Sequence, residues 1–177
     1  MNLHEENIPY ITADISRKVK VRTQKEEKSM WTIRKSIVID RPVKEVFNYA
    51  SNPTYWYQWY AGLSEPENLK GKGEVGTTVE MKYALLGMNL PISLEVIENS
   101  SEGNSRFWNG QITGALNSKQ SWTYNAEGTG TEVKFDMEYE LPGNVLGKVA
   151  NKLIVKKLMD NSAEQTMKNL KDICETD

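Results

Sequence analysis

Apolar and polar residues alternate along two segments that lie near the ends of the main body of the chain. The segment MWTIRKSIVID (30–40) alternates with one interruption at Val38. The segment GTGTEVKFDMEYELPG (128–143) alternates clearly, and every second residue from Val133 to Leu141 is apolar or aromatic. Because successive side chains of a strand point to opposite sides, each segment predicts a strand with one buried face.

Between these two segments the same alternation recurs four times. It predicts strands within 77–87, 88–104, 105–114 and 116–128. The glycine-rich stretch LKGKGEVGT, which precedes them, predicts a turn.

Two short helices are expected directly after the first strand. In RPVKEVFNYASN (41–52), apolar residues follow a helical spacing, and Pro42 suits the first turn of a helix. The step Asn52-Pro53 then interrupts the helix, and NPTYWYQWYAG (52–62) begins a second one. This segment holds five aromatic rings within six residues.

After Pro142 the apolar spacing changes to the period of a helix and continues to about Cys174. A helix of about 30 residues follows from this pattern. The order is one strand, two short helices, five or six strands and one long helix. Short turns between consecutive strands predict an antiparallel sheet and an α+β fold, with the long helix covering one face of the sheet.

Composition narrows the possible functions. The 177 residues carry a net charge of −2, and the isoelectric point is near 5.6, so no electrostatic attraction to nucleic acid is expected. Cys174 is the only cysteine, which suits a reducing compartment. The N-terminus lacks the apolar core of a signal peptide, and no apolar run approaches the length of a membrane helix. We therefore expect a soluble cytoplasmic protein without an integral membrane segment.

Residues 1–29 differ from the rest of the chain. They contain six basic residues between Arg17 and Lys28, and their apolar residues are sparse. The segment is expected to be a solvated N-terminal extension. The alternative is an arm that docks on an acidic partner or on a membrane surface. The folded domain is then expected to span 30–177.

The sequence contains no recognisable catalytic, metal or cofactor motif. His4, the only histidine, precedes the predicted fold, and GKGEVGTT is expected to be a turn rather than a phosphate-binding loop. The charged residues of the predicted strands fall opposite the apolar face, apart from Lys35, which is expected at a frayed strand end or reaching toward water. An interior without carboxylates favours binding over acid–base catalysis.

Part of the chain resembles a known family. SIVIDRPVKEVFNYASNPTYWYQWY (36–60) resembles the opening strand and helix pair of the polyketide cyclase/dehydrase-like branch of the START-related superfamily, which includes the major birch-pollen allergen. GTGTEVKFDMEYELPG resembles the last strand of that family, and the terminal helix matches as well, so the resemblance covers about 30–174. It implies a helix-grip fold, in which a curved antiparallel sheet wraps a long C-terminal helix. It also implies an internal cavity that binds lipids, sterols, polyketides or other apolar molecules.

Within that fold we expect an elongated, mainly apolar cavity between the sheet and the long helix. Its wall is expected to draw on Tyr83, Leu85, Trp108, Gln111, Trp122, Tyr124, Phe135, Met137, Val149 and Leu153. The hydroxyls of Tyr83 and Tyr139 are candidate donors to a ligand carbonyl. Gln120 is expected to be structural or solvated rather than to orient a ligand.

The aromatic run is expected to border the entrance of this cavity. Trp56 is assigned to the core, whereas Trp59, Tyr57 and Tyr60 are expected at the entrance or the surface. Glycine-rich turns nearby would let the entrance open. An exposed aromatic cluster of this kind also suggests transient contact with a membrane.

Three functions remain open. The first is non-catalytic binding or transport of a hydrophobic small molecule such as a lipid, polyketide or aromatic compound, with no cofactor and no metal. The second is a cyclase- or dehydrase-type enzyme that acts on a polyketide-like substrate. The third is a regulatory or stress-related interaction protein whose cavity is vestigial.

Overall fold

The structure is a computed structural model, and it describes residues 30–140 and 151–176. The elements in chain order are β1 (Met30–Ile39), α1 (Val43–Ala50), the 3-10 turn η1 (Pro53–Tyr55), α2 (Trp56–Trp59), β2 (Glu67–Lys70), β3 (Thr78–Leu85), β4 (Met88–Glu102), β5 (Ser105–Gly114), β6 (Asn117–Glu127), β7 (Gly130–Glu140) and α4 (Lys152–Thr176).

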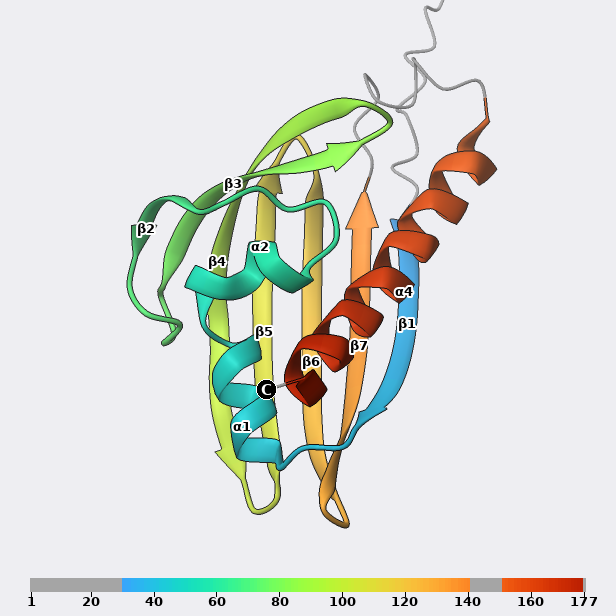
Figure 1. Ribbon diagram of the computed structural model, residues 1–177. Coiled ribbons are helices and arrows are strands. Elements are labelled where there is room, and N and C mark those ends of the chain that lie inside the picture. Colours follow the sequence, from blue (N-terminus) through green and yellow to red (C-terminus); the bar gives the residue numbers. More distant parts are fainter. Residues whose placement is uncertain (1–29, 141–150, 177) are drawn as a thin grey trace, which may run out of the picture.

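The described strands form one sheet in the order β1-β7-β6-β5-β4-β3-β2, and every neighbouring pair is antiparallel (Figure 1). Strands β2 to β7 follow one another in space as they do in sequence. Strand β1 instead joins the far edge beside β7, so the first and last strands of the chain are neighbours. The α+β fold with an antiparallel sheet that the sequence predicted is confirmed.

The helices α1, α2 and α4 all lie on one face of the sheet (Figure 1). Helix α4 packs chiefly against β1 and also contacts α1 and α2. The long helix α4 therefore packs near the β1 edge of the sheet. The two short helices cover the rest of the inner face of the sheet.

Alternation decides which side chains fill the interior. Inward positions of β7 are buried throughout, and Val133, Phe135 and Tyr139 have no exposed surface. Their outward neighbours are charged. In β5 the inward row includes Gly110, where a Cβ atom would collide with the ring of Trp108. Glycine at this position therefore lets the Trp108 indole lie flat along its own strand.

One strand was not predicted from the sequence. The edge strand β2 overlaps the stretch expected to be a turn only in its last two residues; it has four residues, mostly exposed, and Asn68 within it has a φ of 49°. The long helix was expected from Pro142, and its described part, α4, has 25 residues. Leu141, Val149 and the rest of 141–150, as well as residues 1–29, lie outside the described residues.

Candidate ligand-binding site

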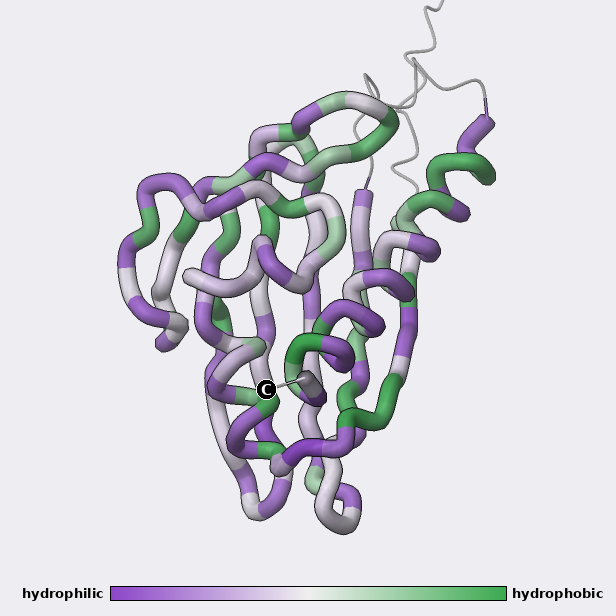
Figure 2. Tube along the Cα trace, in the orientation of Figure 1, coloured by the Kyte–Doolittle hydropathy of each residue, from purple (hydrophilic) through white to green (hydrophobic). Residues whose placement is uncertain are grey.

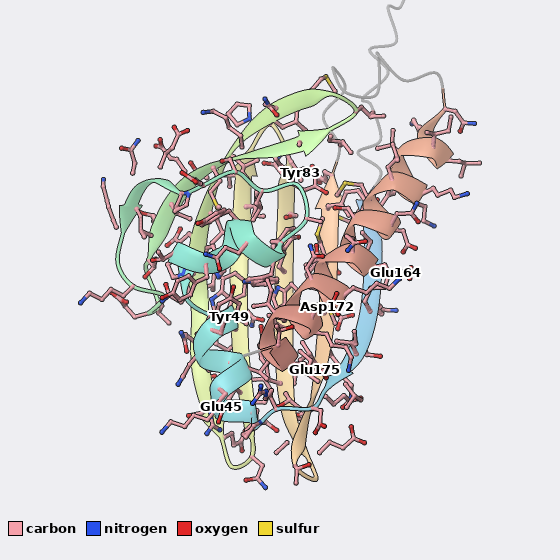
Figure 3. All side chains as sticks on the ribbon, viewed as in Figure 1. Glu45, Tyr49, Tyr83, Glu164, Asp172 and Glu175 are labelled. Atoms are coloured by element: carbon pink, nitrogen blue, oxygen red, sulfur yellow. The ribbon has the colours of Figure 1, made fainter. Side chains whose placement is uncertain are left out.

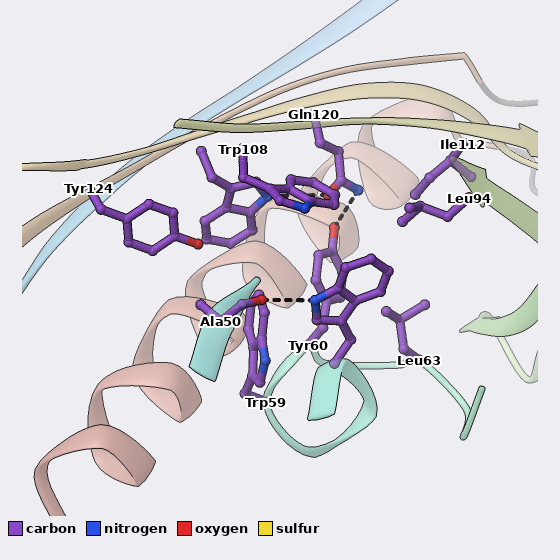
Figure 4. Close-up of a pocket in the computed structure, with 11 residues that line it drawn as sticks. Ala50, Trp59, Tyr60, Leu63, Leu94, Trp108, Ile112, Gln120 and Tyr124 are labelled. Atoms are coloured by element: carbon purple, nitrogen blue, oxygen red, sulfur yellow. Dashed lines mark hydrogen bonds between the residues drawn. The ribbon is translucent and has the colours of Figure 1, made fainter. Parts of the chain in front are cut away.

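An aromatic pocket lies between the short helices and the middle of the sheet (Figure 4). Its lining comes from α1, α2 and the loop after α2 on one side and from β4, β5 and β6 on the other. The lining residues are Ala50, Trp56, Trp59, Tyr60, Leu63, Leu94, Trp108, Ile112, Gln120, Trp122 and Tyr124. The described part of α4 supplies none of them. The space left free for the centre of a water-sized molecule is only about 20 Å³, which is room for about one water.

The Asn52-Pro53 step brings the tryptophans of α2 into this pocket. The side chain of Asn52 accepts a hydrogen bond from the Thr54 amide at 3.0 Å, which caps the 3-10 turn after α1. The chain then enters α2, where Trp56 and Trp59 are three residues apart and share the inward face. The Trp56 indole donates to the Ala50 carbonyl at 2.8 Å and so ties α2 to the end of α1.

Edge-to-face ring contacts join the two walls of the pocket. Trp56 meets Trp108 with centroids 5.3 Å apart and an interplanar angle of 77°. Trp59 meets Trp122 at 5.4 Å and 88°. Behind this layer Phe135 stacks on Trp122 at 4.1 Å. Such contacts stabilise a pair of rings beyond the free energy gained by burying their surface. They therefore favour the closed arrangement of the pocket.

Gln120 and Tyr60 form the central polar pair of the pocket. The Gln120 amide donates to the Tyr60 hydroxyl at 2.9 Å (Figure 4). The Tyr60 hydroxyl in turn donates to the sulfur of Met137 at 3.8 Å. Burial raises the pKa of Tyr60, an effect that Tyr83 reinforces and the hydrogen bond from Gln120 opposes. At neutral pH this hydroxyl is therefore protonated and serves as a hydrogen-bonding group, not as a base.

Two indole N–H groups of the pocket have no hydrogen-bond partner among the described residues. They belong to Trp59 and Trp108, which are 3% and 5% exposed. The other two indoles differ, because Trp56 donates to Ala50 and Trp122 donates to Gln120 at 3.4 Å. Buried donors usually have a partner, so these two groups are the chemical feature of the pocket that most needs an explanation.

Helix α4 holds the aromatic segment in place through what we call the polar clamp: Ser162, Thr166 and Asn169. Asn169 donates to the Trp59 carbonyl at 3.1 Å, and the Ala61 amide donates to the Thr166 hydroxyl at 3.1 Å. Ser162 donates to the Ala61 carbonyl at 3.2 Å. The backbone on both sides of Tyr60 is therefore fixed to α4.

Carboxylates of the helices lie away from the pocket. Figure 3 shows Glu45, Glu164 and Asp172 on the outer sides of α1 and α4, and all three are exposed. In the described part of the chain, no group of three or more His, Cys, Asp or Glu residues could hold a metal ion. The lining of the aromatic pocket itself contains no carboxylate, amine or imidazole.

Comparison with protein families identifies the chain. Residues 30–175 match the family described as polyketide cyclase / dehydrase and lipid transport. The chain belongs to this family. Hydrophobic ligands are bound by members of the family, and the expected resemblance is confirmed. A search among curated proteins gave no match.

Solved structures share the fold of this family member at low sequence identity. Ara h 8.0201 superposes with a TM-score of 0.60 and 11% identity, over 84% of this chain and 100% of that chain. The Zhui aromatase/cyclase from Streptomyces sp. R1128 gives 0.65 and 9%, over 83% and 94%. A START superfamily protein from Mycobacterium smegmatis gives 0.61 and 15%, over 82% and 97%. At such identities the likeness establishes the fold alone.

The structure brings four of the predicted site residues together in the aromatic pocket: Trp59, Trp108, Trp122 and Tyr124. Four others, Tyr83, Leu85, Phe135 and Met137, are buried on the same inner face but do not line this pocket. The Tyr83 hydroxyl is already engaged, because it donates to Ser162 of the polar clamp at 3.0 Å.

Two predicted wall residues are misplaced. Gln111 is exposed on the outer face, because Trp108, Gly110 and Ile112 occupy the inward positions of β5 and an odd spacing from Trp108 points outward. Leu153 is 72% exposed, because the first turn of α4 turns this residue away from the sheet. Val149, the remaining one, lies outside the described residues.

The expected position of Trp59 at the entrance was wrong as well. It is buried against Trp122, and Tyr60 turns its hydroxyl into the pocket, so only Tyr55 and Tyr57 of the aromatic run remain exposed. Trp56 is buried, as expected. Gln120 is an interior residue rather than a solvated one, and its even spacing from Trp122 and Tyr124 was the available signal.

Lys35 also has a role that the sequence did not predict. Its ammonium group lies 2.9 Å from Asp160 of α4, with the side chain 21% exposed. The pair links β1 to the helix at the surface of the domain. Lys35 therefore belongs to the packing of α4 and lies apart from the aromatic pocket.

Proposed function

We propose that this protein binds a small, mainly apolar molecule in the aromatic pocket without transforming it. One observation carries the proposal: a wall built almost wholly of rings and aliphatic side chains, with Gln120 and Tyr60 as its central polar pair. Apolar surface of a ligand that is buried against such a lining contributes favourably to the free energy of binding. The lining also supplies few groups that could donate or accept a proton. Membership of a family described as polyketide cyclase / dehydrase and lipid transport supports the binding of an apolar molecule, whereas the absence of a chemical step rests on the lining alone.

Binding in this pocket requires the pocket to open. The free space of about 20 Å³ is too small for anything larger than water, so a ligand must displace side chains. The aromatic segment around Trp59 and Tyr60 is the part that moves, because it forms one whole wall of the pocket. Its movement must break the hydrogen bonds of the polar clamp to α4. Contacts between the ligand and the aromatic rings then replace the ring–ring contacts that are lost when the pocket opens.

The enzymatic alternative has less support in the lining. A cyclase or dehydrase step needs a group that takes or gives a proton near neutral pH. The titratable groups of the pocket are Tyr60 and Tyr124, and burial raises the pKa of both. Both hydroxyls are therefore protonated at neutral pH, so they can orient a carbonyl by donating a hydrogen bond but cannot act as a general base.

A regulatory protein with a filled interior is the second candidate, and the small free volume is the observation that favours it. The two candidates differ in one measurable respect. A binder opens to take up an apolar probe, whereas a filled core excludes it.

The same proposal includes transient contact with an anionic membrane, at the first turns of α4 rather than at the aromatic run. Leu153, Ile154 and Leu158 are 72%, 52% and 38% exposed. Figure 2 shows green, hydrophobic segments between purple, hydrophilic ones along these turns. Lysines at 152, 156 and 157 stand among them, and no acidic residue occurs from 151 to 159. Exposed apolar residues flanked by lysines suit anionic lipid head groups.

In the described residues, no helix is long and apolar enough to span a membrane. Cys174 is the only cysteine in the sequence, which fits a cytoplasmic location, and this location is also part of the proposal.

The test is uptake of indane, a small bicyclic hydrocarbon, measured by calorimetry. Ile112→Trp places a large ring in the pocket and is expected to weaken binding at least about tenfold, because the added ring occupies the ligand volume. Thr113→Trp is the matched control, since Thr113 is the next residue of β5 and is exposed on the outer face. It should bind indane like the wild type. Circular dichroism melts establish that both variants fold.

The outcome that contradicts the proposal is a wild-type protein that does not bind indane and yields no apolar compound in the organic extract of the purified protein. The filled-interior alternative would then be preferred.

A further inference from the structure

The unpartnered indole N–H groups of Trp59 and Trp108 point to the chemistry of the ligand. We infer that the ligand is a flat apolar molecule carrying a hydrogen-bond acceptor oxygen, such as a ketone, which accepts from one or both of these indoles. This inference rests on the proposed function and extends it from an apolar molecule to an oxygen-bearing one.

The two donors stand on opposite walls of the aromatic pocket. Trp108 belongs to β5 in the sheet, whereas Trp59 belongs to α2, and Figure 4 shows them on either side of the space that Tyr60 and Gln120 border. Both nitrogen atoms are shielded from solvent, so bulk water does not satisfy them. Separating a donor from water without a partner costs free energy, and an acceptor oxygen that enters with the ligand recovers it.

Gln120, Tyr60 and the indoles of Trp56 and Trp122 already have hydrogen-bond partners. Gln120 donates its amide N–H to Tyr60 and accepts from the Trp122 indole, and the Trp56 indole donates to the Ala50 carbonyl. A ligand acceptor that binds without breaking these bonds can accept from the Trp59 and Trp108 indoles or from the Tyr124 hydroxyl. Of these three, only the two indoles are shown as buried donors without a partner among the described residues. A hydrocarbon would leave both donors unpaired, and a carboxylate would meet no cationic side chain among the lining residues.

One structural explanation competes with this inference. The edge-to-face contacts of Trp59 with Trp122 and of Trp56 with Trp108 place ring edges near ring faces. An N–H group that points at a ring face makes a weak hydrogen bond to it. Such a bond would occupy the donor without any ligand, so the experiment must separate the two explanations.

The experiment compares 1-indanone with indane, which differ by one carbonyl in place of a CH₂ group. Without a donor in the pocket, indane binds more tightly, because the ketone loses hydrogen bonds to water. With a free buried donor, 1-indanone binds the wild type about tenfold more tightly than indane. Calorimetry gives both dissociation constants, and only their ratio tests the inference.

Three tryptophan-to-phenylalanine variants then assign the donor. Trp108→Phe and Trp59→Phe keep a ring but remove an unpartnered N–H, so at least one of them should abolish the preference for 1-indanone while retaining indane binding. Trp56→Phe is the matched control, since its N–H is already bonded to Ala50. It should leave the ratio unchanged and lower the melting temperature more than Trp108→Phe does, because it alone breaks an existing bond.

The outcomes are distinguishable. If the wild type binds neither compound, the proposed function fails. If indane binds and the preference for 1-indanone is absent, the indoles are satisfied by ring faces. If the preference persists in the double variant Trp59→Phe with Trp108→Phe, another group such as the Tyr124 hydroxyl is the donor. Either result overturns the inference.

Discussion

At the scale of single residues, the pocket depends on which polar groups are paired. Tyr60 shows this most clearly, because its hydroxyl is enclosed by rings, accepts from Gln120 and donates to Met137. Burial raises the pKa of Tyr60 above the ordinary value of 10.0. The protonated hydroxyl is therefore part of the closed pocket, and its ionisation is linked to unfolding.

This linkage predicts how stability depends on alkaline pH. Below pH 10 Tyr60 is protonated in both the folded and the unfolded chain, so stability is unaffected. Above pH 10 the unfolded chain releases the proton first, so the free energy of unfolding falls by up to about 1.4 kcal/mol per pH unit for each such tyrosine. Tyr60→Phe should make the fall shallower by up to that amount, measured by urea unfolding between pH 9 and 11.

Tyr57→Phe is the control for this prediction, because Tyr57 is exposed on the same short segment. It should leave the slope unchanged. Equal slopes for Tyr60→Phe and the wild type would show that Tyr60 ionises as readily in the folded protein as in the unfolded chain.

At the scale of elements, α4 has two halves with different surroundings. From Val155 onward its inward residues, such as Met159 and Leu170, are buried against the sheet and the short helices. Its first turns carry exposed apolar side chains and lysines instead. A single helix thus has one segment that closes the domain and one whose exposed surface is suited to a lipid interface.

The first turns of α4 are expected to bind anionic vesicles. The double variant Leu153→Glu with Ile154→Glu should weaken binding to vesicles of phosphatidylcholine with phosphatidylglycerol by at least about tenfold, because two apolar contacts are lost and two negative charges are added. Co-sedimentation measures the effect. Binding to pure phosphatidylcholine should be weak for both proteins.

A matched double variant controls for the general effect of added charge. Val75→Glu with Ile97→Glu alters two residues that are 59% and 48% exposed but lie elsewhere, in the loop before β3 and in β4. It should lose only the small part of binding that follows from a more negative net charge. If both double variants lose binding equally, the contact is non-specific and the assignment to α4 fails.

At the scale of the whole molecule, the alternation of apolar and polar residues predicted the strands of the sheet. This pattern depends only on which face of the sheet each side chain points to. Trp122, Tyr124 and Phe135 were placed inside for this reason. Gln111 was misplaced because it was assigned to the same wall as Trp108 although the two residues have an odd spacing in β5. The location of the pocket could not be predicted in the same way. It depends on how α2 folds back over the sheet, and on long-range bonds such as that from Asn169 to the Trp59 carbonyl, which no local pattern encodes.

These long-range bonds make the polar clamp the expected barrier to ligand entry. Thr166 is fully buried, and its hydroxyl accepts the Ala61 amide at 3.1 Å. Thr166→Val keeps the shape of the side chain but leaves that amide unpaired in the closed state, which costs about 1–3 kcal/mol. Because the open state exposes the amide to water, the substitution favours opening and should raise the rate of indane uptake about tenfold in stopped-flow tryptophan fluorescence. Amide hydrogen exchange at Ala61 should accelerate by a similar factor. Asp172→Asn, an isosteric change on the outer side of the same helix, should alter neither rate. Faster exchange at Ala61 without faster uptake would mean that the ligand enters by a route that leaves the clamp closed.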